Sequence, residues 1–334
     1  MPIRRYLKNG KVRKGKKSGY KVENWSAYNQ SLKKRGMLSL YFPPGDLESV
    51  LYNASSYVKG ISGQLPRYQP AYIQLIYTFY RLFDWGMRQI EGYFEDLWRS
   101  KGLKIPVPSF GHLSELFESI PLSTKQFCED ITKRLQRGEK IALILDSTGF
   151  RFPKARDWHR KKYGQEPKKR PIRKLHLSID PDFNTHAVEV TEENVPDINV
   201  MDDILPEEVK SLVNQLFADG GYYDHTKCQA LREQGIIPVI PPPKGAVVHG
   251  KESTVWHDAL VSYIQQKGSI YAFYKKFNYG IRERIEAHFS RITRCIGEGF
   301  KTIKLPSQRN EGIIIANIMN LWNSFGKPVS VKLG

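Results

Sequence analysis

The feature that most constrains the fold is a run of five consecutive apolar residues, Ile141 to Leu145, in the stretch KIALILDSTGF. Such a run, bounded by polar and turn-prone residues, predicts a strand that is buried on both faces. We expect this strand to end at Asp146, because Ser-Thr-Gly follows it. A strand covered on both faces needs a layer on each side, so the chain should hold a sheet between helices.

The residues that follow this strand predict the rest of the sheet. IRKLHLSIDPDFNTHAVEVT alternates apolar and polar residues on both sides of a DPDFN turn, which predicts an antiparallel hairpin. VNQLFADGGYYD predicts a strand followed by Asp219, HTKCQALREQG predicts a helix, and IIPVIPPP predicts another strand. The expected fold class is therefore α/β, a mixed sheet flanked by helices.

The segment from Pro66 to Ile120 has a different pattern. Its apolar residues recur three and four apart, which predicts a helix on each side of DWG and a third helix over 110–118. Three such helices are compatible with a helix-turn-helix unit that reads DNA. The third helix, GHLSELFES, carries two glutamates and no arginine, so a plain helical packing domain remains open.

The charge balance points to a polyanionic partner. The chain has 52 Lys plus Arg against 34 Asp plus Glu, a net charge of +18, and nucleic acid is the first candidate partner. The first 35 residues hold twelve Lys or Arg and one acid, typical of an arm that grips phosphates or of a tail that only aids solubility. No apolar run approaches the length of a membrane span and no signal-peptide pattern occurs, so we expect a cytoplasmic protein with no membrane partner, associated with the nucleoid when it acts.

A second basic segment covers residues 151–174. It holds eleven Lys or Arg against two acids, interleaved with aromatic residues, so its cations can hold phosphates while its aromatic rings stack on bases. A solvated loop is the competing interpretation. The candidate DNA-binding residues are Arg151, Lys154, Arg156, Trp158, Arg160, Lys161, Lys162, Lys168, Lys169 and Arg170.

Three carboxylates form the candidate chemical site. Asp146 and Asp219 each follow a predicted strand, and strand ends that neighbour one another bring such side chains together at the ligand-binding edge of a sheet. Two carboxylates about 4 Å apart repel by roughly 4 kcal/mol at an effective dielectric of 20, and a divalent cation removes that conflict. Glu286, on a predicted helix from Tyr279 onward, borders an apolar stripe that should pack on the sheet, which makes it the candidate third ligand. The alternative is that the aspartates cap turns and Glu286 forms a surface ion pair.

An all-oxygen ligand set suits Mg²⁺ or Mn²⁺. The three cysteines show no Cys/His pairing that would build a zinc site. A two-ion site of this kind activates an attacking water or 3′-hydroxyl and stabilises the leaving oxygen, which is phosphodiester chemistry.

Four segments, LILDSTGF, RKLHLSID, ADGGYYD and YGIRERIEAHF, resemble in order and spacing the core motifs of bacterial DDE transposases of insertion-sequence family five. The resemblance extends to NWSAYNQSLKKRG and ANIMNLW and so covers nearly the whole chain. It implies an RNase H-like core and a triad of Asp146, Asp219 and Glu286 that binds the metal ions. It also places Tyr279 and Arg282 in the Tyr-x2-Arg-x3-Glu signature.

The signature expects a lysine seven residues after the glutamate, where this chain has Thr293, and Arg294 or Arg291 is the candidate replacement as a phosphate contact. The resemblance implies a transposase that cuts DNA at the element's terminal inverted repeats and joins the 3′-hydroxyl to target DNA, acting as a homodimer. A structure-specific nuclease and a domesticated DNA-binding protein without activity are the alternatives.

The expected domains are a basic arm over 1–60, a helical DNA-binding domain over 61–138, the catalytic domain over 139–326 and a tail over 327–334.

Overall fold

The computed structural model describes residues 19–52, 67–152 and 172–333, and it divides into two compact units. One unit comprises Met1–Leu40 with Phe325–Gly334, and the other is Tyr41–Ser324. No helix in the described ranges is long and apolar enough to cross a lipid bilayer.

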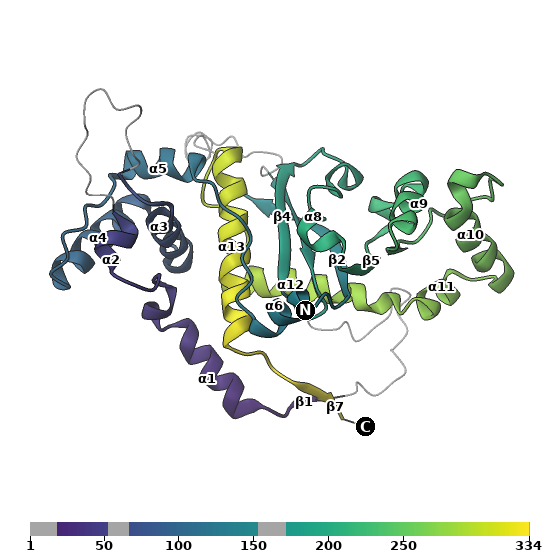
Figure 1. The fold of residues 1–334 in the computed structure, drawn as a ribbon, viewed down its shortest axis with the longest axis horizontal. Helices are drawn as coiled ribbons and strands as arrows, with labels where there is room; N and C mark the ends of the chain where they lie inside the picture. Colours follow the sequence, from purple (N-terminus) through teal and green to yellow (C-terminus); the bar gives the residue numbers. More distant parts are fainter. Residues whose placement is uncertain (1–18, 53–66, 153–171, 334) are drawn as a thin grey trace, which may run out of the picture. The chain divides into compact units, whose positions relative to one another are not determined.

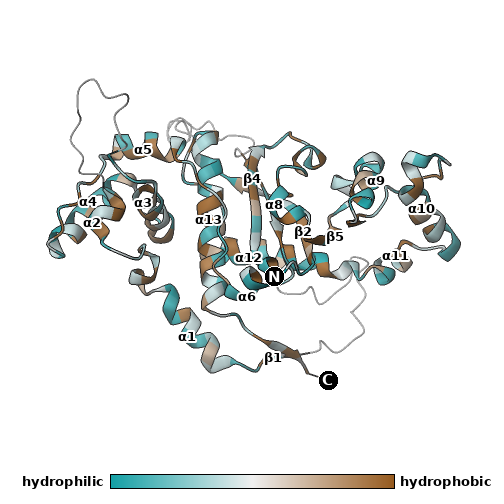
Figure 2. Cartoon of the chain, in the orientation of Figure 1, coloured by the Kyte–Doolittle hydropathy of each residue, from teal (hydrophilic) through white to brown (hydrophobic). Residues whose placement is uncertain are grey.

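The smaller unit combines both ends of the chain. Strand β1 (Tyr20–Val22) pairs antiparallel with β7 (Ser330–Lys332), and helix α1 (Trp25–Arg35) follows β1. Helix α1 is largely polar along its length (Figure 2) and ends in three basic residues, which interact favourably with the negative end of the helix dipole. The short 3-10 helix η1 (Leu38–Tyr41) comes next in the chain.

The N-terminal part of the larger unit is helical, as predicted. The helix over 70–83 begins with Pro70 in its first turn, where the missing backbone N–H of proline is tolerated. It ends before Asp84, whose backbone is left-handed with φ of 55°. Its apolar side packs against the next helix through a cluster of aromatic rings that includes Tyr72, Phe94 and Trp98. The helices are α2 (Leu47–Leu51), α3 (Pro70–Phe83), α4 (Met87–Ser100), α5 (Phe110–Ser119) and α6 (Glu129–Gln136).

A five-stranded mixed sheet forms the centre of the larger unit, in the order β4-β3-β2-β5-β6 (Figure 1). The pairs β4–β3 and β3–β2 are antiparallel, and the pairs β2–β5 and β5–β6 are parallel. The hairpin predicted from the alternating pattern is the β3–β4 pair. The strands are β2 (Ile141–Arg151), β3 (Ile172–Ile179), β4 (Thr185–Glu192), β5 (Val213–Phe217) and β6 (Ile237–Val239).

Helices cover both faces of this sheet. Leu143 and Leu145 of β2 belong to a core cluster with residues of α6 and of α9 (His225–Glu233). On the other face, α13 (Leu305–Phe325) lies alongside β4 (Figure 1), and a side chain at Gly312 would begin only 3.0 Å from Val190. The run of five apolar residues is thus buried on both faces, and the α/β fold class with a mixed sheet between helices is confirmed.

The remaining elements connect the sheet to its helical layers. After β4 come the 3-10 helix η2 (Asp197–Val200) and α8 (Glu207–Lys210), and after β5 the 3-10 helix η3 (Gly220–Tyr222). Between β6 and α13 lie η4 (Glu252–Thr254), α10 (Val255–Lys267), α11 (Ile270–Lys276), the 3-10 helix η5 (Tyr279–Arg282) and α12 (Glu283–Cys295).

Two sequence-based boundaries are wrong. The first strand does not end at Asp146, because β3 pairs with β2 through Arg151 and supplies the hydrogen bonds that extend it past the turn-prone Ser-Thr-Gly. The helix that carries Glu286 does not begin at Tyr279, because residues 279–282 form a 3-10 turn and α12 begins at Glu283. A left-handed backbone at Asn278, with φ of 51°, separates this turn from α11.

Candidate active site

Asp146, on β2, and Asp219, just after β5, occupy equivalent positions relative to the pairing of these two parallel strands. The last paired residues of β2 and β5 are Ile144 and Phe217, and each aspartate stands two residues beyond its own member of that pair. Because side chains two residues apart share a face of a strand, the register aims both carboxylates to the same side at the edge where the parallel pairing stops. The sequence analysis expected both acids to stand at strand ends. Only Asp219 follows the end of its strand, because β2 continues past Asp146, so it is the strand register that brings the two acids to one edge of the sheet.

Asp219 is held by its own turn. Its side chain caps η3, and its Oδ1 accepts a hydrogen bond from the Gly221 backbone N–H at 2.8 Å. The hydroxyl of Tyr279 donates to the Ala218 carbonyl oxygen at 3.0 Å, which places η5 against the end of β5. Tyr279, predicted only as part of a signature, therefore positions the turn that leads into Glu286.

Arg282 joins the other two acids of the predicted triad. One guanidinium nitrogen contacts Asp146 Oδ2 at 2.8 Å and the other contacts Glu286 Oε1 at 2.6 Å. The Asp146 side chain is only 15% exposed, whereas that of Glu286, in the first turn of α12, is 59% exposed. The guanidinium thus acts as the cation between two carboxylates that come from segments 140 residues apart.

The electrostatics of this edge favour a further cation. The pKa of Asp146 is raised to about 6, chiefly by burial and to a lesser degree by the charges of Asp219 and Glu286, while the Ser147 N–H and Arg282 oppose the shift. The three acids therefore repel one another, and the single positive charge of Arg282 compensates them only in part.

The structure brings a fourth carboxylate to this edge that the sequence analysis did not identify. Asp197 begins η2, and its Oδ1 accepts hydrogen bonds from Ser147 Oγ at 3.2 Å and from Lys174 Nζ at 3.0 Å. Ser147 directly follows Asp146 in β2. Asp197 lies in an irregular segment with no apolar periodicity, so only the fold reveals that it lies near the triad.

A buried tyrosine hydroxyl lies in the same region. Tyr222 is completely buried, and its hydroxyl has no hydrogen-bond partner among the residues that the structure describes. Burial raises its pKa well above the ordinary value, and the charges of Asp197, Asp146 and Asp219 add to the rise. A buried hydroxyl without a partner costs about 1–3 kcal/mol, so it marks a place where a water molecule or a ligand belongs.

Gly221 lies between the side chains of Asp219 and Asp197. A side chain there would begin 3.0 Å from Asp219 Oδ1 and 3.5 Å from Asp197 Oδ2. Both carboxylates therefore face the same small volume, which only a glycine leaves open. Oxygen donors, an unpartnered hydroxyl and this open volume together fit a hard divalent cation with bound water. Across residues 19–52, 67–152 and 172–333, however, no three His, Cys, Asp or Glu side chains are already arranged to hold a metal ion.

The other predicted residues stand apart from the triad. Thr293 Oγ1 donates to the Phe289 carbonyl and Arg294 Nε to the Ser290 carbonyl, both within α12, so the expected phosphate contact by Arg294 stays a prediction. Arg151, at the end of β2, lies 3.9 Å from Glu298. The other nine candidate DNA-binding residues, Lys154, Arg156, Trp158, Arg160, Lys161, Lys162, Lys168, Lys169 and Arg170, lie outside the described residues.

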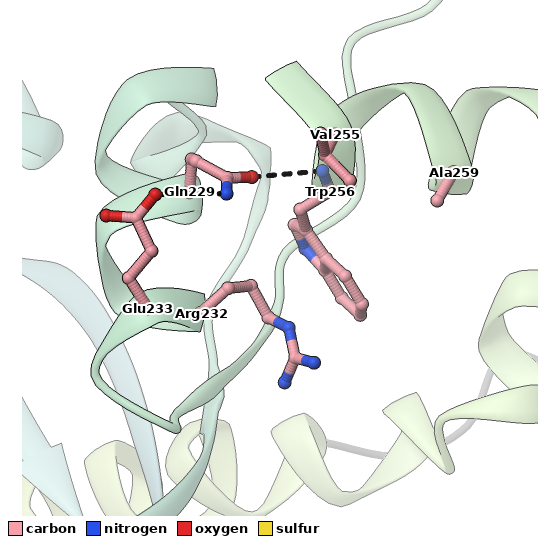
Figure 3. A pocket seen from close by; sticks show the side chains of 6 residues that line it. All are labelled: Gln229, Arg232, Glu233, Val255, Trp256 and Ala259. Atoms are coloured by element: carbon pink, nitrogen blue, oxygen red, sulfur yellow. Dashed lines mark hydrogen bonds between the residues drawn. The ribbon is translucent and has the colours of Figure 1, made fainter. Parts of the chain in front are cut away.

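Two hollows lie in the segment between β5 and α12. One, of about 520 Å³, has Arg282 in its wall, so the acid cluster adjoins open space. The other, of about 240 Å³, lies between α9 and α10 (Figure 3). There the Arg232 guanidinium covers the ring of Trp256 at 4.7 Å, and Gln229 accepts a hydrogen bond from the Trp256 backbone at 3.1 Å.

A five-stranded mixed sheet flanked by helices, with four carboxylates and an arginine at its edge, is consistent with an RNase H-like core. Two family models, each described as a transposase DDE domain, match the chain, one over residues 137–321 and one over residues 33–154. The first match covers more than half of the chain, and the protein belongs to the DDE transposase family. No solved structure matches the chain.

Membership of this family establishes a transposase, a class of enzyme that acts on DNA and generally uses divalent metal ions. The narrower assignment to insertion-sequence family five stays a prediction.

Proposed function

We propose that this transposase cleaves DNA at the terminal inverted repeats of its element and transfers the freed 3′-hydroxyl into target DNA. The observation that supports this most is the equivalent register of Asp146 and Asp219, with Glu286 joined to Asp146 through Arg282. The three acids that we propose as the triad thus come from β2, from the residues just after β5 and from α12.

Two Mg²⁺ or Mn²⁺ ions are the proposed cofactor. Asp146, Asp219 and Glu286 are the residues that would hold the ions. When bound, the ions lower the pKa of the attacking water or hydroxyl and stabilise the charge on the leaving oxygen. The donor set fits, because all the ligands are hard oxygens.

Arg282 has a different partner in each state under this proposal. In the structure its guanidinium holds one oxygen of Asp146 and one of Glu286, so a cation that binds these acids competes with the guanidinium for them. A released guanidinium lies next to a hollow of about 520 Å³ and is suited to grip a DNA phosphate in bidentate fashion. Arg282 would thus bind phosphate only when the carboxylates have other cations.

Substitution of each acid tests the proposal. Asp146→Asn, Asp219→Asn and Glu286→Gln should each slow cleavage and strand transfer by at least about a thousandfold, because a lost metal contact removes several kcal/mol of transition-state stabilisation. The assay uses purified protein, a library of inverted-repeat duplexes and Mn²⁺, with gel analysis of nicked and joined products.

Glu283→Gln is the matched control, since Glu283 is an exposed acid in the same first turn of α12. It should retain activity, and all four variants should still bind DNA. Undiminished cleavage by any triad variant would remove that residue from the proposed set. Cleaved products without joined products would instead indicate a nuclease.

A homodimer is part of the same proposal. Two element ends must be cut and joined together, and one chain carries one set of triad acids. Light scattering of the protein with an end duplex should give the mass of two chains per pair of duplexes.

A further inference from the structure

Tyr222 and Asp197 lie beside the proposed ligands but belong neither to the triad nor to its signature. Tyr222 follows the Asp219 cap by three residues, and Asp197 reaches the same place from η2, about fifty residues after Asp146. Asp197 Oδ2 lies beside Gly221, and the buried Tyr222 hydroxyl is subject to the charges of Asp197, Asp146 and Asp219.

The Tyr222 hydroxyl needs a partner that the described protein does not supply. It is completely buried, and it has no hydrogen-bond partner among the described residues. The groups whose charge acts on it are the carboxylates of Asp197, Asp146 and Asp219. A buried hydroxyl that has no protein partner and is subject to the charge of nearby carboxylates is a place where a bound water molecule would complete the hydrogen bonding.

Asp197 is oriented for the same purpose. Its Oδ1 is occupied by Ser147 Oγ and Lys174 Nζ, and its Oδ2 is the oxygen that faces Gly221, 3.5 Å from where a side chain there would begin. The opposite wall of that volume is Asp219 Oδ1, a proposed metal ligand, at 3.0 Å from the same point. Asp197 therefore has one oxygen anchored and one turned toward the proposed cation site.

We propose that Tyr222 and Asp197 are positioning residues for the divalent cation, and that they hydrogen-bond to water molecules in its first hydration shell. Mg²⁺ and Mn²⁺ sites built on a few carboxylates keep several bound waters, and these waters need acceptors and donors around them. The hydroxyl of Tyr222 would complete its hydrogen bonding only when the hydrated cation is present. This inference rests on the proposed function, since it takes Asp146 and Asp219 as ligands.

Tyr222→Phe is the decisive variant, because it removes the hydroxyl and keeps the buried ring. Without metal it should leave the melting temperature equal to or above that of the parent protein, because the group it removes has no partner. With metal it should weaken Mn²⁺ binding about tenfold or more, as is typical when an outer-sphere partner of a metal site is lost. The measurements are thermal unfolding with and without Mn²⁺ and titration with Mn²⁺ followed by electron paramagnetic resonance, both in the absence of DNA.

Tyr223→Phe is the matched control. The neighbouring hydroxyl of Tyr223 is hydrogen-bonded to the His257 imidazole, so its loss should lower the melting temperature equally with and without Mn²⁺ and leave the Mn²⁺ affinity unchanged. Asp197→Asn should weaken Mn²⁺ binding as Tyr222→Phe does. In the double variant, the fold-loss of Mn²⁺ affinity should be smaller than the product of the two single fold-losses, because both residues act on the same waters.

Failure of this inference and failure of the proposed function give different results. If Asp146→Asn and Asp219→Asn bind Mn²⁺ like the parent protein, the proposed function is overturned. If those two variants lose Mn²⁺ while Tyr222→Phe binds it with parental affinity, only the role of Tyr222 is overturned. A fall in the metal-free melting temperature of Tyr222→Phe as large as the fall for Tyr223→Phe would also overturn it, because the hydroxyl would then be structural.

Discussion

At the residue scale, His176 is a titratable side chain whose pKa is changed by burial in the sheet. It is fully buried on β3, its Nε2 lies 2.8 Å from Thr191 Oγ1, and it pairs across the sheet with Ser147 of β2. Burial lowers the pKa of His176 to about 4, with Lys174 lowering it and Asp197 raising it. His176 is thus a hydrogen-bonded core residue that stays neutral at neutral pH.

The lowered pKa makes stability depend on pH. In the unfolded chain His176 takes up a proton below pH about 6.5, whereas in the folded protein it does so only below about 4, so the unfolded state binds more protons between these values. The free energy of unfolding should therefore fall as pH drops through this window, by up to about 1.4 kcal/mol per pH unit from this group. His176→Gln should flatten that part of the profile, measured by urea unfolding from pH 7 to 4. An unchanged slope would show that other groups cause it.

At the element scale, α13 is tied to the helical region by a buried ion pair. Arg81 of α3 contacts Glu311 of α13 at 2.8 Å, and both side chains are almost completely buried. Glu311 also accepts hydrogen bonds from the backbone N–H groups of Lys301 and Thr302 and from the Thr302 hydroxyl. One carboxylate thus fastens α3 and the loop before α13 to the helix that covers the sheet.

Breaking this pair from one side should be costly. Glu311→Gln should destabilise the protein by about 3–5 kcal/mol, because it leaves the Arg81 guanidinium buried without a counter-charge. The double variant Arg81→Met with Glu311→Gln should recover part of that loss, since no buried charge then remains. Urea unfolding of the parent, the two single variants and the double variant measures the coupling. A double variant less stable than Glu311→Gln would contradict this explanation.

The whole molecule carries a net charge of +18, which is a statement about partners rather than about fold. In DNA binding, each neutralised phosphate releases counterions, so affinity falls with rising salt in proportion to the number of phosphate contacts. The role of the basic arm over 1–60 and of the helical region over 61–138 in DNA binding stays a prediction. Salt dependence can test the arm at its described part, because Lys33 and Lys34 are exposed in the last turn of α1.

If the arm grips phosphates, Lys33→Gln with Lys34→Gln should reduce the slope of log affinity against log salt by about two. The matched control is Lys244→Gln with Lys251→Gln, two exposed lysines between β6 and η4 that lie outside the arm and the helical region, which should leave the slope unchanged. The slope is measured by fluorescence anisotropy with a labelled duplex between 50 and 200 mM salt. Equal slopes in both double variants would favour a tail that only aids solubility.

What the sequence determined by itself was the set of local patterns. The five apolar residues of β2, the alternation of the β3–β4 hairpin and the helical spacing of α3 and α4 depend on neighbours in the chain, so the type and order of these elements were predicted. The acids Asp146, Asp219 and Glu286 were singled out because each stood out from such a local pattern. The extension of β2 to Arg151 was missed, because the hydrogen bonds that sustain it come from β3.

Only the tertiary structure decided how these acids meet. The register of β2 with β5 places Asp146 and Asp219 side by side, Arg282 joins Asp146 to Glu286, and Asp197 and Tyr222 arrive from segments with no pattern of their own. The reason is physical, since strand register and side-chain pairing across more than a hundred residues are set by packing of the whole sheet. The periodicity of apolar residues along the chain does not predict those contacts.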